Sequence, residues 1–158
     1  MIDRLNELVA KLASWTLLLL VMLVVYDAIM RYAFHSGNIA LQELEWHLFD
    51  IVVLLGIGYA LQKNLHVRVD IFYDRYPKRL QRFVDIVALT LFILPFSLLI
   101  VSIGYDFTML SFSQLEGSSN PGGLPYRFIV KSLIPLTFIL LVLQVFSDFF
   151  KAFRELRR

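Results

Sequence analysis

The stretch LASWTLLLLVMLVVYDAIM, residues 12–30, contains a single charged residue, Asp27. A helix needs roughly 20 apolar residues to cross about 30 Å of hydrocarbon. Three further stretches of the same character follow, at 41–61, 83–105 and 128–146. One such stretch could be a buried helix of a soluble core, but four in 158 residues leave too little polar surface to cover them. The sequence therefore predicts an all-α integral membrane protein with four transmembrane helices.

Composition supports a single membrane domain covering residues 1–158. The chain is 58% hydrophobic with a mean hydropathy of +0.69, against about 45–50% apolar residues in soluble domains. The first apolar run continues without a small-residue cleavage pattern, so we expect a retained helix and not a signal peptide. The absence of cysteine excludes thiolate catalysis and cysteine metal sites. The expected helices span about 8–31, 41–62, 78–106 and 126–150.

The basic residues predict the orientation of the bundle, because lysine and arginine concentrate in cytoplasmic loops. Twelve of the fifteen fall in the N-terminal arm, the connection at 63–82 and the C-terminal tail. We therefore expect both termini and the connection at 63–82 on the cytoplasmic side of the membrane, with lipid surrounding the helices. This asymmetry also accounts for the net charge of +2 without any role in nucleic-acid binding. The twelve residues are Arg4, Lys11, Lys63, Arg68, Arg75, Lys78, Arg79, Arg82, Lys151, Arg154, Arg157 and Arg158.

The connection between the second and third helices can be read in two ways. Residues 65–71 alternate apolar and polar as in a strand, but a lone strand beside a bilayer would leave its backbone groups unpaired. As a helix, the same segment gathers its apolar residues on one side. We therefore predict a short amphipathic interfacial segment. Its apolar side would comprise Leu65, Val69, Phe72 and Tyr76.

Four residues inside the expected helices bear on helix shape and packing. Pro95 and Pro135 lie within the third and fourth helices, and we expect a kink at each because proline removes a helical hydrogen bond. Gly56 and Gly58 lie within the second helix, where small residues allow another helix to approach closely.

The charged residues of the first two helices require partners, because an ion in hydrocarbon is costly. Asp27 and Arg31 are four residues apart and can pair on one helix face. Glu43, His47 and Asp50 form one polar stripe on the second helix. Three interpretations of this stripe stay open: a metal site, a buried salt-bridge network joining the first two helices, or contacts with another subunit.

Other function classes find weaker support in the sequence. His47 is the sole histidine inside a span, so the facing pair of ligands for a haem is missing. There is no nucleophile motif or phosphate loop, and we expect no enzymatic activity and no bound cofactor. A small proton-coupled exporter acting as a homodimer remains an alternative, with Asp27 or Asp50 as its carboxylate. A membrane anchor of a redox complex is another.

Three segments of the chain share a pattern with a known family: MRYAF at 30–34, QELEWHLFDIVVLLGIGYALQKNLHVRVD at 42–70 and GLPYRFIVKSLIPLTFILLVLQVF at 123–146. They resemble the small (Q-type) membrane subunit of tripartite ATP-independent periplasmic (TRAP) transporters. By this resemblance, Arg31 and Glu43 match the family's first-helix arginine and second-helix glutamate, and Gly56 matches its glycine. His66, Arg68 and Asp70 match its His-x-Arg-x-Asp run. Asp27 and Asp50 depart from the pattern, and the resemblance assigns them no role.

The resemblance implies a division of labour among three proteins. A large membrane subunit would bind the organic acid and sodium and move them by an elevator motion, and a periplasmic binding protein would deliver the substrate. This chain would be a static scaffold packed one-to-one against the large subunit, with no substrate, metal or cofactor of its own.

On this interpretation, the His-x-Arg-x-Asp run fastens the middle loop at the membrane edge. Arg68 and Asp70 can form charge-assisted hydrogen bonds, either within the subunit or to the large subunit. A pH-sensitive role for His66 is the third possibility.

Overall fold

A computed structural model describes residues 2–63 and 76–156 of the chain. Its regular structure within these residues is entirely helical, which confirms the predicted all-α fold. The chain is a multi-pass membrane protein with four helical segments long and apolar enough to cross a bilayer. The predicted interfacial segment lies almost wholly in 64–75, outside the described residues. The four spans are Ile2–Ala33, Ile39–Gln62, Lys78–Ser113 and Phe128–Lys151.

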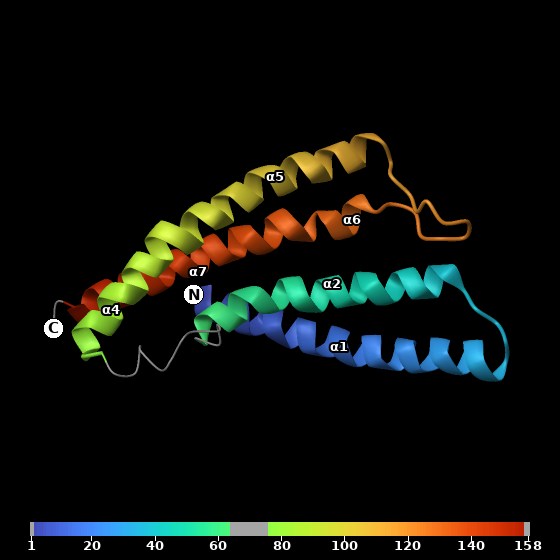
Figure 1. Cartoon of the computed structure of the whole chain (residues 1–158), viewed down its shortest axis with the longest axis horizontal. Helices are drawn as coiled ribbons and strands as arrows, with labels where there is room; N and C mark the ends of the chain where they lie inside the picture. The colour runs from blue at the N-terminus through green and yellow to red at the C-terminus, as the bar shows by residue number, and fades with distance from the viewer. Residues whose placement is uncertain (1, 64–75, 157–158) are drawn as a thin grey trace.

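The helices form two antiparallel hairpins that lie side by side (Figure 1). Both chain ends lie at one end of the bundle, here called the inner end, and the turn at 34–38 and the loop at 114–127 lie at the outer end. The loop at 114–127 is called the outer loop below. The first hairpin comprises α1 (Ile2–Ala33) and α2 (Ile39–Gln62), and the second comprises α4 (Lys78–Val87), η1 (Ala88–Ile93), α5 (Leu94–Ser113), α6 (Phe128–Lys131) and α7 (Leu133–Leu156).

Within the first hairpin, α1 packs through a narrow seam. Its buried residues recur every seven positions, a spacing that keeps one line of side chains against a neighbouring helix. The seam is apolar in its middle and polar near both ends, where Asn6 meets a partner from α7 and Asp27 pairs with Arg31 of the same helix. The seam residues are Asn6, Ala13, Leu20 and Asp27.

The two hairpins share a small apolar core. Leu61 of α2 and Leu89 of η1 pack with Leu141 and Val145 of α7, and all four are buried. Outside this contact the bundle is thin, since only 11–22% of the most apolar part of each span is buried. Most of the helical surface is therefore available to lipid or to another membrane protein.

Both proline-containing helices depart from regular α-helical hydrogen bonding near the proline. Pro135 lacks the N–H that would bond to Lys131, and α6 ends at that residue. The six-residue π-helical stretch η1 ends just before Pro95, with the Leu94 N–H bonded to the carbonyl of Leu89, five residues back. Each proline thus displaces the regular hydrogen-bond pattern of its helix.

Candidate functional site

The carboxylate of Glu43 lies at the outer end of α2 and is enclosed by the outer loop. It is 2% exposed, and Ser118 donates its hydroxyl to it. The backbone N–H of Leu124 donates at 2.7 Å, and the side chains of Asn120 and Arg127 donate at 3.2 Å each. We call these five residues the outer clamp. The clamp ties α2 to the second hairpin, so Glu43 finds its partners in the outer loop and not on α1.

The backbone of the outer loop is shaped around this carboxylate. Gly122 adopts a φ of +81°, which glycine reaches without strain. The Ser118 N–H bonds to the Leu124 carbonyl at 2.9 Å and closes the loop. A Cβ added at Gly123 would lie 2.7 Å from Oε2 of Glu43 and closer still to the Ser118 side chain. Position 123 therefore accepts only glycine while the clamp is closed.

A second ion pair supports the outer loop from α6. Lys131 donates to Glu116, and its Nζ lies 4.0 Å from the centre of the Phe107 ring on α5. The Lys131 ammonium holds the pKa of Glu116 below its usual value. Together with the outer clamp, this pair fixes both ends of the loop.

The predicted pair of Asp27 and Arg31 is present on α1. Asp27 is 1% exposed, and Arg31 reaches it from the surface. Oδ1 of Asp27 is buried without a hydrogen-bond partner in the part of the chain that the structure describes. The pair reduces the cost of a buried carboxylate near the outer end of the first span.

Glu43, His47 and Asp50 do not act together in one network. His47 and Asp50 are half-buried on α2, and the hydrogen bonds found among residues 2–63 and 76–156 include neither. No three His, Asp or Glu side chains within those ranges come together as a group that could hold a metal ion. Only Glu43 of the three is engaged by the outer loop.

A polar cluster at the inner end was not anticipated from the sequence. Asn6 of α1 donates to Gln144 of α7 at 2.8 Å, and the two side chains are 2% and 0% exposed. Gln144 in turn donates to Asp3 at 3.1 Å and to Asp148 at 3.0 Å. Lys151 completes the cluster by donating to Asp3 at 2.8 Å and to Asp148 at 2.9 Å. We call these residues the inner tie, since they join the first and last helices.

The two glycines of α2 differ in what they contact. A Cβ added at Gly58 would lie 3.0 Å from the Asn6 side chain, so Gly58 allows α1 and the inner tie to approach. Among residues 2–63 and 76–156, a Cβ added at Gly56 would meet nothing within 4 Å. Close approach to another helix of this chain is therefore seen at Gly58 and not at Gly56.

The remaining predicted site residues are those of the His-x-Arg-x-Asp run. His66, Arg68 and Asp70 lie outside the described residues, so their suggested fastening role stays a prediction. The residues of the outer clamp and the inner tie, by contrast, join helices and the outer loop to one another.

Comparison with known proteins gives a consistent result. The family model for tripartite ATP-independent periplasmic transporters, DctQ component, matches residues 20–155. A protein of Haemophilus influenzae, named as a candidate TRAP transporter small permease protein, is 26% identical over 147 residues. The matched region covers 92% of this chain and 90% of that protein.

Proposed function

Because the chain belongs to the family of DctQ components of TRAP transporters, we propose that it is the small scaffold subunit of a sodium-coupled transporter for organic acids. It binds no substrate itself and packs one-to-one against a large elevator-type membrane subunit. A periplasmic binding protein delivers the substrate, and sodium binds to the large subunit. The complex lies in the inner membrane of a bacterium or archaeon, with both termini of this chain in the cytoplasm.

The observation that carries this proposal is the use of polar residues to lock the bundle at both ends. The outer clamp joins α2 to the outer loop, and the inner tie joins α1 to α7. Between them most of the span surface is apolar and uncovered. A body fixed in this way, with broad apolar faces, is suited to support a moving carrier domain in the membrane.

The proposal assigns no catalysis to the chain. The outer clamp and the inner tie occupy their acidic and basic groups with one another, and each donor in them has a structural acceptor within the chain. Arg31 and Glu43, which the family resemblance singles out, are both held in such pairs. Their role is then to maintain the shape that the large subunit recognises.

The test is co-expression of this chain with the large subunit, followed by purification in mild detergent and reconstitution. We expect a one-to-one complex, and substrate uptake that requires both membrane subunits, the binding protein and a sodium gradient. A chain that moves solute alone would support the exporter alternative, and a chain that carries a bound chromophore would support the redox anchor. Failure to form the complex would refute the scaffold function.

A further inference from the structure

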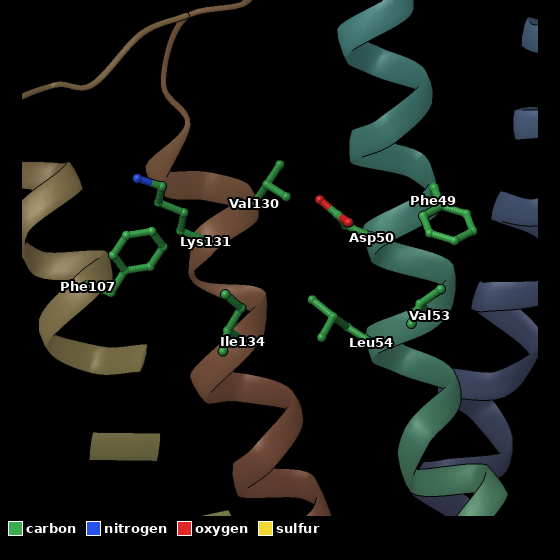
Figure 2. Close-up of a pocket in the computed structure, with 8 residues that line it drawn as sticks. All are labelled: Phe49, Asp50, Val53, Leu54, Phe107, Val130, Lys131 and Ile134. Atoms are coloured by element: carbon green, nitrogen blue, oxygen red, sulfur yellow. The ribbon is translucent and has the colours of Figure 1, made fainter. Parts of the chain in front are cut away.

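A cleft separates the two hairpins in the outer half of the bundle. Its lining includes one acidic side chain, that of Asp50, for which the described part of the chain supplies no partner. The cleft has a volume of about 350 Å³ and its walls are mainly apolar. Figure 2 shows the carboxylate of Asp50 pointing from α2 across the gap toward α6. The lining includes Phe49, Asp50 and Leu54 of α2, Phe107 of α5, Lys131 of α6 and Ile134 of α7.

Lys131 does not neutralise Asp50, although both line the cleft. Its ammonium is paired with Glu116 and lies over the Phe107 ring, and in Figure 2 it points away from Asp50. Asp50 takes part in none of the hydrogen bonds or ion pairs found within residues 2–63 and 76–156. The cleft therefore contains a carboxyl group that has no partner in this part of the chain.

The depth of Asp50 in the membrane restricts which groups can pair with its side chain. Asp50 lies near the middle of α2, about 17 Å from either end at 1.5 Å per residue. The hydrocarbon layer is about 30 Å thick, so lipid head groups remain at its edges and do not reach this carboxylate. A second copy of this chain would bring another Asp50, and its outer-half cations Arg31, Arg127 and Lys131 are already paired.

We infer that the cleft is a docking site for a transmembrane helix of the large subunit, and that a lysine or arginine of that helix enters it and pairs with Asp50. This inference rests on the proposed scaffold function and names the chemistry of the contact. Apolar walls on both hairpins would pack around the incoming side chain, and the desolvated ion pair would set the register of the two subunits.

The test measures the affinity of the purified large subunit for variants of this chain in lipid nanodiscs. Interhelical polar contacts in membranes imply that Asp50→Asn weakens binding about three- to twentyfold. Asp50→Glu retains the charge and should bind like the wild type. The matched control is Asp106→Asn, which removes an exposed carboxylate of α5 that does not line the cleft. Equal binding by Asp50→Asn and the wild type, or an equal loss in Asp106→Asn, would overturn the inference.

A second measurement tests whether the cleft is covered in the complex and leaves Asp50 unchanged. The chain has no cysteine, so Val53→Cys places a unique thiol on the cleft lining, where Val53 is 46% exposed. We expect maleimide to label this thiol in the isolated chain and to be excluded in the complex. If the wild-type complex forms but the thiol stays reactive and Asp50→Asn binds normally, the cleft assignment alone is wrong. If no wild-type complex forms, the scaffold function fails with it.

Discussion

The buried contact between Asn6 and Gln144 offers the sharpest test of how the bundle is held together. Both side chains are almost fully buried and their hydrogen bond is 2.8 Å long. Interhelical hydrogen bonds in membranes couple by about 0.6 kcal/mol on average and up to about 1.7 kcal/mol. We expect this pair to lie in the upper part of that range, at about 1–1.7 kcal/mol, because no solvent competes for it. Gln144→Met alone should cost more, about 2–3 kcal/mol, because it leaves the buried Asn6 amide without its acceptor. It also removes one donor from Asp3 and Asp148, which then keep only Lys151.

The assay is a double-mutant cycle with Asn6→Ala and Gln144→Met. The free energy of unfolding would be measured by titrating bicelle-reconstituted protein with sodium dodecyl sulfate, with tryptophan fluorescence as the signal. Thr137→Val provides the control, since Thr137 is also buried on α7 but lies two turns from Gln144; its effect should add to that of Asn6→Ala. A coupling energy between Asn6 and Gln144 no larger than that with Thr137 would refute the inner tie as a stabilising contact.

Three further predictions concern the outer loop and the glycines. Gly123→Ala should open the outer clamp, because the new methyl group would overlap Ser118 and approach Glu43; faster proteolysis of the outer loop would report the opening. The pair of Glu116 and Lys131 should lose its stabilising effect in acid. Folding lowers the pKa of Glu116 below its ordinary value of 4.5. The pair therefore contributes its full stabilisation above pH 4.5, and this contribution disappears as the pH falls through the lowered pKa of the folded chain. A spin label at Ser119→Cys should then become more mobile as the pH falls through this lowered pKa, which lies below 4.5. Gly104→Val should destabilise the second hairpin by about 1–3 kcal/mol through overpacking. The Cβ alone would lie 3.1 Å from the Ile134 side chain, and valine adds two more methyl groups.

Matched variants distinguish these effects from general damage. Gly37→Ala has open space around its new methyl group and should leave the outer loop intact. Glu116→Gln should abolish the acid-dependent change in label mobility; a change that persists would assign it to another group. Gly56→Ala has nothing within 4 Å and should leave the isolated chain as stable as before or slightly more stable. A large loss of stability in Gly56→Ala would contradict the packing described for α2.

The sequence was sufficient to predict the four membrane-spanning helices, because four apolar runs of span length have few alternatives in a short chain. It also predicted the pair of Asp27 and Arg31, since a spacing of four residues is a local property of a helix. The irregularities near Pro95 and Pro135 were predictable for the same reason. Each of these features depends on residues that are close together in the sequence.

The long-range contacts could not be predicted in this way. Asn6 and Gln144 are separated by 138 positions, and each is an ordinary polar residue near a helix end when considered alone. The partners of Glu43 include a backbone N–H whose position depends on the fold of the outer loop. Gly56 and Gly58 look equivalent in the sequence, yet only the second faces the Asn6 side chain. Each of these contacts depends on how the hairpins meet.

The inner tie has a consequence for biosynthesis. Asn6 enters the membrane with the first helix, whereas Gln144 arrives only with the last. Until then the amide of Asn6 must remain near the lipid head groups or in contact with the insertion machinery, because the hydrocarbon offers it no acceptor. A chain that stops before its fourth helix would keep this amide exposed, and a membrane protease could use such a group to distinguish unfinished chains from complete ones.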